Sequence, residues 1–234
     1  MLMESTPLHS SQTRDEFAMV HRLIALSFMV LLSASAAGPA AGQEAKGVGT
    51  TGSIAGLRAP HQVELVRKVN AYFNGLTTLE GTFVQTGADN KRQRGKFYIS
   101  RPGRFRFEFN PPSRVVIISD GQYIAIQDRD LSTDDRWDLG YTPFRALLQD
   151  NVDLLRDARV LEAEEKEDAI SIVFEDKTGD SSSRIRLFLS AKPSLQIKGW
   201  IAKDAQGFDT RTDLTEMHVP VGQLDANLFN PAAH

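Results

Sequence analysis

The hexapeptide that starts at Arg104 constrains the fold of this chain more than any other feature. Its residues, Arg-Phe-Arg-Phe-Glu-Phe, alternate strictly between charged and aromatic side chains. Successive side chains of a β-strand point to opposite faces of the sheet, so this period of two is typical of a strand. The pattern predicts a strand over residues 104–109, with Phe105, Phe107 and Phe109 facing an apolar interior and the charged residues facing water.

The residues after this strand predict two further strands that pair with it. Residues 115–118 are four consecutive apolar residues, which is typical of a strand covered on both faces. Asp120-Gly121 favours a hairpin turn, so residues 123–126 are expected to form the returning strand. The alternation places further apolar residues on the inner face of these two strands: Val115, Ile117, Ile124 and Ile126.

The same two periodicities predict most of the remaining elements. Apolar residues between 61 and 75 recur at helical spacing and Pro60 suits a first turn, so an amphipathic helix is expected there. Alternation predicts further strands over about the following residues: 79–85, 96–100, 159–165, 169–175, 184–190, 195–203 and 208–217.

The strand pattern breaks between residues 140 and 157, where a helical insertion is expected. Thr142 can cap a helix that has Pro143 at its first position. The apolar face of this helix has three residues: Phe144, Leu147 and Leu148. A second short helix is expected at 152–156.

No alternation of strands with helices favours a parallel sheet. The expected fold is therefore mainly β with some α, with about ten antiparallel strands. We expect an incomplete, strongly curved antiparallel β-barrel that is covered by the N-terminal helix and by a helical lid insertion.

The start of the chain predicts export. Residues 23–32 are almost entirely apolar, follow His21 and Arg22, and precede many small residues. This arrangement is typical of a secretory signal peptide, whereas a membrane-spanning helix needs about 20 apolar residues. The alternative is a buried helix at the start of a domain. The expected organisation has three parts: a signal peptide over 1–42, a flexible leader over 43–59 and one domain over 60–231.

Composition and spacing exclude several classes of function. The net charge of −3 disfavours nucleic-acid binding, which needs an excess of basic residues. The absence of cysteine excludes thiolate metal sites, a cysteine nucleophile and a lipid anchor on cysteine, so we expect no membrane anchor. The acidic stretch 128–135 lacks the glycine and glutamate of a calcium loop and is expected to be a solvated turn. Without histidines at metal-ligand spacing or a nucleophile motif, we expect no metal, no cofactor and no enzymatic activity.

The tripeptide Arg101-Pro102-Gly103 lies between two predicted strands, one of which carries the three phenylalanines. One interpretation of Arg101 is an ordinary surface charge at a turn. The other is that Arg101 turns toward the concave side of the sheet, where its five donors need acceptors. The unpaired carbonyls at a helix end are such acceptors, and an arginine bonded to them would act as a latch on a covering helix.

The stretch from Gly95 to Phe107 resembles the signature of the periplasmic outer-membrane lipoprotein carrier family, LolA. Members carry a glycine, alternating hydrophobic residues and an Arg-Pro pair, followed by an aromatic strand. Further matches follow the order of the chain: Phe83-Val84-Gln85, Pro112, Ser119-Asp120-Gly121, Thr142-Pro143-Phe144, Leu228-Phe229 and Pro231. One departure is Ile124-Ala125-Ile126-Gln127, which replaces a more aromatic segment of the family.

The resemblance implies a half-open barrel in the periplasm whose apolar cavity takes up the acyl chains of lipoproteins. It implies that Arg101 bonds to the backbone of the lid and holds the empty carrier closed, and that Phe105 and Phe107 line the cavity. The implied partners are acylated lipoproteins as cargo, an inner-membrane ATP-driven transporter that releases them, and an outer-membrane receptor.

Three functional hypotheses follow. The first is a monomeric, non-enzymatic carrier that ferries lipoproteins from the inner to the outer membrane. The second keeps the fold but makes the protein a lipid shuttle or a sensor of lipoproteins in envelope stress. The third, an extracytoplasmic hydrolase, lacks a nucleophile motif. An exposed acyl chain costs about 0.8 kcal/mol per CH₂, so a carrier needs an enclosed apolar cavity with a movable cover.

Overall fold

The computed structural model of the protein describes residues 59–142, 144–177, 184–204 and 206–233. The predicted signal peptide and all but the last residue of the predicted leader lie outside the described residues.

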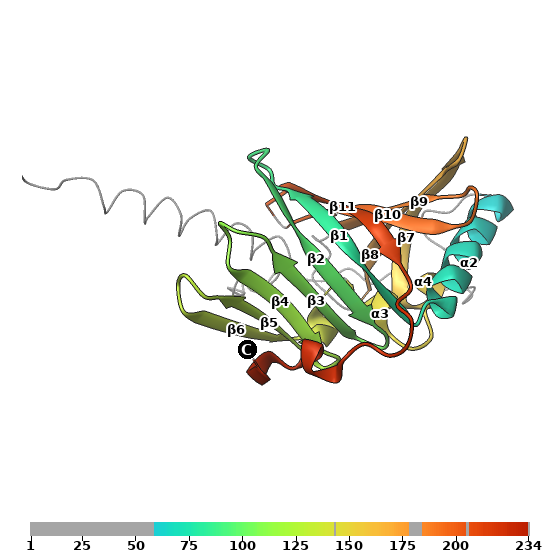
Figure 1. Ribbon diagram of the computed structural model, residues 1–234. Helices are drawn as coiled ribbons and strands as arrows, with labels where there is room; N and C mark the ends of the chain where they lie inside the picture. The colour runs from blue at the N-terminus through green and yellow to red at the C-terminus, as the bar shows by residue number, and fades with distance from the viewer. Residues whose placement is uncertain (1–58, 143, 178–183, 205, 234) are drawn as a thin grey trace, which may run out of the picture.

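One antiparallel sheet of 11 strands dominates the described residues (Figure 1). Its strand order is β6-β5-β4-β3-β2-β1-β11-β10-β9-β8-β7, so β6 and β7 are the two edges and the sheet does not close. The expected incomplete antiparallel barrel is therefore confirmed. The strands have these bounds: β1 Thr78–Thr86, β2 Arg92–Ser100, β3 Arg104–Phe109, β4 Val115–Asp120, β5 Tyr123–Asp128, β6 Thr133–Asp138, β7 Ala158–Lys166, β8 Ala169–Asp176, β9 Arg184–Ser190, β10 Gln196–Lys203 and β11 Asp209–His218.

The N-terminal helix α2, Pro60–Gly75, lies beside β7 at one end of the curved sheet (Figure 1). Pro60 suits its first turn, where the missing N–H costs nothing, and the Gln62 side chain accepts from the backbone N–H of Ala59 at 3.1 Å. Its buried face includes Val66 and Phe73. No helix among the described residues has both the length and the hydropathy that a membrane crossing needs.

The connection from β6 to β7 forms the helical insertion. It contains η1, Leu139–Tyr141, followed by α3, Arg145–Leu148, and α4, Leu154–Asp157. The two α-helices have only one turn each, because Asp153 caps α4 and the intervening chain is extended at Gln149. The helix α4 packs against both α2 and β7, and α3 packs against α4.

The alternation that predicted β3 to β5 correctly separates the two faces of the sheet. The inner residues of these strands are all buried in one hydrophobic core: Phe105, Phe107, Phe109, Val115, Ile117, Ile124 and Ile126. The core continues through α2, α3 and the inner faces of β7 to β10.

The outer face of β4 is also buried, which confirms the prediction for residues 115–118. After β11 the chain forms η2, Ala226–Phe229, and η3, Pro231–Ala233, which pack on β4. Val116 and Ile118 are buried there, on the face opposite the main core.

The expectation that the charged face of β3 is wet is wrong at Arg106. Only 2% of Arg106 is exposed. Its Nη1 donates to the carbonyl of Leu228 at 3.2 Å, and its guanidinium pairs with Glu108 at 2.5 Å. The covering segment comes from more than a hundred residues further along the chain, so a local alternation could not reveal it.

Strand β6 was not predicted. Residues 128–135 were expected to be a solvated turn, but the turn is shorter, and β6 pairs with β5 from Thr133 onwards. Most β6 side chains are exposed, and the strand therefore lacks the apolar alternation that identifies a strand in a sequence.

A buried carboxylate ties three strands together on the side of the sheet away from the core. Glu175 of β8 is opposite Arg159 of β7 and Arg184 of β9. Both arginines donate to it, Arg184 through Nη2 at 2.9 Å and Arg159 through Nε at 3.1 Å. Burial alone would raise the pKa of Glu175, but the hydrogen bonds from Arg159 and Arg184 outweigh burial and hold the pKa below its ordinary value.

We expect Glu175→Gln to lower the free energy of unfolding at neutral pH by about 1–3 kcal/mol, since it removes the charge between the two arginines. The folded pKa is lower than the unfolded one, so the carboxylate stabilises the fold above the ordinary glutamate pKa of about 4.3. This stabilisation is lost as the pH falls through the folded pKa. Urea denaturation checks the prediction, because the difference between wild type and variant shrinks from neutral pH to about pH 3.

A matched control is Glu164→Gln, which removes an exposed carboxylate that pairs with Lys166 on β7. It is expected to change the free energy of unfolding by less than about 0.5 kcal/mol. A difference between wild type and Glu175→Gln that stays constant with pH would contradict the lowered pKa.

Candidate functional site

Arg101 lies at the end of β2 and joins the ends of two helices. Its Nη1 donates to the carbonyl of Leu76, the residue directly after α2, at 3.3 Å. Its Nη2 donates to the carbonyl of Gln149, the residue directly after α3. Carbonyls at the end of a helix have no partner within the helix, so they are available acceptors. Of the two interpretations of Arg101, the structure matches the one in which it turns toward the covering helices.

The backbone of the same turn makes a parallel contact. The N–H of Gly103 donates to the carbonyl of Leu148 at 2.8 Å, directly beside the carbonyl that Arg101 holds. Gly103 has a φ of +66°, and a Cβ at this position would lie 2.7 Å from the Cα of Gly121. Only glycine therefore fits, and the Arg-Pro-Gly turn holds two successive carbonyls of the insertion.

The charge of Arg101 persists in this environment. Burial lowers the pKa of its guanidinium from the ordinary value, and the carboxylate of Asp150 acts in the opposite direction. Arginine remains protonated in proteins. Its Nε is buried and has no hydrogen-bond partner within the described part of the chain, so the closed arrangement leaves one donor unsatisfied.

An apolar pocket of about 70 Å³ lies beside Arg101. Six of the predicted site residues line it: Arg101, Phe105, Phe107, Phe144, Leu147 and Leu148. Six further lining residues were not predicted as site residues: Phe73, Leu76, Ile99, Leu187, Ile197 and Trp200. Ile197 and Trp200 of β10 both reach the inner face because the register of this strand shifts between Ile197 and Gly199, and the sequence reveals neither this irregularity nor which strands meet Arg101.

The other five predicted cavity residues lie elsewhere in the core. They are buried but do not line this pocket: Phe109, Val115, Ile117, Ile124 and Ile126. Their contact with a ligand remains a prediction.

The pocket is too small for an acyl chain as it stands. An apolar cavity of about 150 Å³ holds one benzene molecule, and this pocket is less than half that size. Residues 144–150, which we call the α3 segment, supply the apolar side chains Phe144, Leu147 and Leu148 to its wall. A larger ligand could enter only if such a wall moved.

Two asparagines of α2 fix the chain just after the α3 segment. The Asn74 side chain accepts from the backbone N–H of Val152 at 2.7 Å and donates to its carbonyl at 3.0 Å. The Asn70 side chain accepts from the N–H of Leu154 at 3.2 Å. Helix α4 is therefore tied to α2. The α3 segment is bonded to the Arg-Pro-Gly turn and, through the Gln149 side chain and the Asp157 carboxylate, to α4. Sequence reasoning missed this contact because asparagine on a helix usually faces water.

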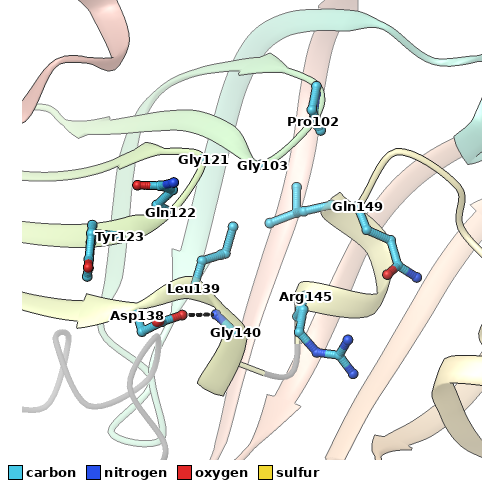
Figure 2. Close-up of a pocket in the computed structure, with 11 residues that line it drawn as sticks. Pro102, Gly103, Gly121, Gln122, Tyr123, Asp138, Leu139, Gly140, Arg145 and Gln149 are labelled. Carbon is cyan, nitrogen blue, oxygen red and sulfur yellow. Dashed lines mark hydrogen bonds between the residues drawn. The ribbon is translucent and has the colours of Figure 1, made fainter.

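A second, larger cleft of about 410 Å³ opens on the other side of the α3 segment. It lies between the Pro102-Gly103 turn, the turn at Gly121, η1 and α3. In Figure 2, Gln122 and Tyr123 lie across this cleft from Arg145 and Gln149, with Leu139 between them. Leu148 lines both this cleft and the apolar pocket.

No group of three or more histidine, cysteine, aspartate or glutamate side chains among the described residues could hold a metal ion.

Sequence comparisons with known proteins identify one family. The family profile described as "Outer membrane lipoprotein carrier protein LolA" matches residues 74–232. An outer-membrane lipoprotein carrier protein of Chromobacterium violaceum is 33% identical over 166 residues, which cover 67% of this chain and 78% of the relative. A protein of the same name from Ralstonia nicotianae is 31% identical over 193 residues, covering 76% of this chain and 87% of the relative.

The structure is also similar to that of a LolA superfamily protein from Nitrosomonas europaea. The match has a TM-score of 0.40 at 12% sequence identity and covers 71% of this chain and 98% of that chain. The family profile and the sequence relatives establish the relationship by themselves. The chain belongs to the LolA family of outer membrane lipoprotein carrier proteins.

Proposed function

We propose that this protein is a non-enzymatic carrier that binds the acyl chains of lipoproteins between the curved sheet and the α3 segment. In this proposal it moves lipoproteins through the periplasm from the inner to the outer membrane. The α3 segment acts as the lid and Arg101 as its latch.

The observation that carries the proposal is the position of Arg101. Its guanidinium bonds to backbone carbonyls at the ends of α2 and α3, at the rim of an apolar pocket that α3 covers. Backbone acceptors of this kind hold a helix in place without depending on its side chains. Acyl chains that replace the contacts of Phe144, Leu147 and Leu148 would therefore compete directly with the closed lid.

The energetics of acyl chains support a covered pocket. A chain of about 16 carbons exposes apolar surface that costs roughly 12 kcal/mol in water. An open apolar patch of that size promotes aggregation, whereas a pocket that closes when empty avoids exposing it.

The proposed partners follow from the family. Two relatives at 31–33% identity are named outer-membrane lipoprotein carrier proteins. By analogy, an inner-membrane ATP-driven transporter supplies the cargo, an outer-membrane receptor accepts it, and the carrier travels between them as a monomer.

Mass spectrometry of the protein purified from the periplasm tests the proposal. We expect acylated lipoprotein to co-purify with it. Free lipid alone would favour a lipid shuttle instead. The absence of any bound acylated material would contradict the carrier function.

Two variants test whether the cargo binds in the apolar pocket. Leu147→Lys places a charge in the wall of the apolar pocket, where Leu147 is buried. We expect it to reduce the recovered cargo about tenfold, because an unpaired charge is costly in an apolar site. Leu131→Lys makes the same change at an exposed position and is expected to leave recovery unchanged.

A further inference from the structure

The cleft and the apolar pocket are separated by a very thin wall. Leu148, the last residue of α3, lines both spaces. Its backbone carbonyl is bonded to the N–H of Gly103, which also lines the cleft. A displacement of Leu148 together with the α3 segment would join the two spaces.

The two spaces differ in chemistry. Apart from Arg101, the pocket is lined only by apolar side chains, so it suits acyl chains and excludes a polar backbone. The cleft has a mixed lining: its polar side chains are those of Gln122, Asp138, Arg145 and Gln149, and its apolar or aromatic ones are those of Pro102, Tyr123, Leu139 and Leu148. Such a lining offers hydrogen-bonding groups that the apolar pocket lacks.

The size of the cleft also fits a ligand. Its volume of about 410 Å³ falls within the range of about 300–1,000 Å³ that is typical of small-ligand sites. Two backbone hydrogen bonds join residues of its lining, Gly103 to Leu148 at 2.8 Å and Leu139 to Gln122 at 2.8 Å.

A lipoprotein brings both chemistries together, because its acyl chains and its polypeptide meet at one residue. We propose that the cleft binds the first residues of the cargo polypeptide, next to the acylated residue, while the pocket binds the acyl chains. This inference rests on the proposed carrier function and adds a second subsite to it. The cleft offers the peptide the side chains of Gln122 and Tyr123 on one side and of Arg145 on the other.

Two fluorescent probes separate the subsites: palmitic acid, and a tripalmitoyl-cysteinyl peptide that carries the same fluorophore. The test variant is Gln122→Trp, which fills the cleft from an exposed turn position. The backbone N–H of Gln122 bonds to Asp120, and its carbonyl accepts from Leu139. The substitution leaves both backbone contacts in place. We expect the variant to bind the acylated peptide about tenfold more weakly and palmitic acid within about twofold of wild type.

Gln206→Trp is the matched control. Gln206 is exposed in the turn between β10 and β11, and its N–H bonds to Asp204 two residues earlier, as that of Gln122 does to Asp120. That turn lies at the other end of the sheet, so this variant is expected to bind both probes as wild type does.

The outcomes separate this inference from the carrier function itself. Equal weakening of both probes by Gln122→Trp, or an unchanged affinity for the acylated peptide, overturns the peptide subsite and leaves the carrier function standing. If the wild-type protein binds neither probe, the carrier function itself fails. Unchanged binding of palmitic acid shows at the same time that the variant is folded.

Discussion

Replacing Arg101 by leucine is expected to release the α3 segment from the sheet while the sheet itself stays intact. The variant loses the hydrogen bonds to the carbonyls of Leu76 and Gln149, and hydrogen bonds from charged donors contribute about 1.5–3 kcal/mol each. Because Arg101 is partly exposed and its Nε has no hydrogen-bond partner among the described residues, we expect a net shift of about 2 kcal/mol toward the open lid.

Hydrogen exchange measures this shift directly. The N–H of Gly103 bonds to the carbonyl of Leu148, so this hydrogen bond exists only while the α3 segment lies against the turn. A shift of about 2 kcal/mol corresponds to exchange roughly thirty times faster at this amide. The amides of β1 and β2 are expected to keep their wild-type rates.

The same variant is expected to hold cargo too well. A closed lid competes with the ligand, so the apparent affinity for an acylated probe rises when the open state is more populated. We expect the release of a tripalmitoyl-cysteinyl peptide to acceptor vesicles to slow about tenfold. Handover would therefore be impaired although uptake is not.

Arg94→Leu provides the control, because Arg94 is an exposed residue of β2, the strand that directly precedes Arg101. It is expected to change neither the exchange rates nor the release of the probe. If Arg101→Leu also leaves both unchanged, Arg101 is not the latch.

Replacing Phe107 by alanine is expected to produce the largest loss of stability. Phe107 is buried, and its ring centroid lies 5.1 Å from that of Phe83 and 5.7 Å from that of Phe97. The rings of Phe105 and Trp200 are at 6.0 and 6.1 Å. Truncation of a buried phenylalanine costs about 3–5 kcal/mol through lost burial and the cavity that remains. In a domain of this size that corresponds to a fall in Tm of roughly 10 °C.

Urea denaturation checks this value, with Phe208→Ala as the control. Phe208 is 55% exposed, so its truncation is expected to change the free energy of unfolding by less than about 0.5 kcal/mol. A loss below about 1 kcal/mol for Phe107→Ala would mean that the centre of the barrel is not closely packed. The loss of unfolding free energy therefore also reports how closely the side chains around Phe107 are packed.

The fold could be predicted where a strand has apolar and polar side chains in alternation, because this pattern is visible in the sequence. Strand β3 carries charged and aromatic residues in strict succession, and its bounds in the structure are those predicted, Arg104–Phe109. Strand β6 could not be found in this way, because its Asp, Thr and Arg side chains face water and carry no apolar pattern. Arg106 was misplaced because a distant segment covers it, and no local pattern reports such long-range burial.

The site could be predicted in part for a similar reason. Arg101, Phe105 and Phe107 lie within one continuous motif, so their proximity follows from two paired strands and the turn between them. Trp200 and Leu187 come from strands that follow the insertion, and only the curvature of the sheet brings them close to Arg101. Asn74 contacts the backbone of Val152, and a contact made to backbone leaves no signal in the partner's side chain.

The two edge strands of the sheet, β6 and β7, are protected in different ways, and this affects whether neighbouring molecules can associate edge to edge. Helices α2 and α4 pack against β7, while β6 presents Asp135, Asp138 and the ion pair of Asp134 with Arg136 along an exposed edge. Charged side chains on an edge strand disfavour pairing with an incoming strand from a neighbouring molecule. At high concentration the molecules are therefore expected to remain separate particles and not to grow into fibrils, even though most of each one is β-structure.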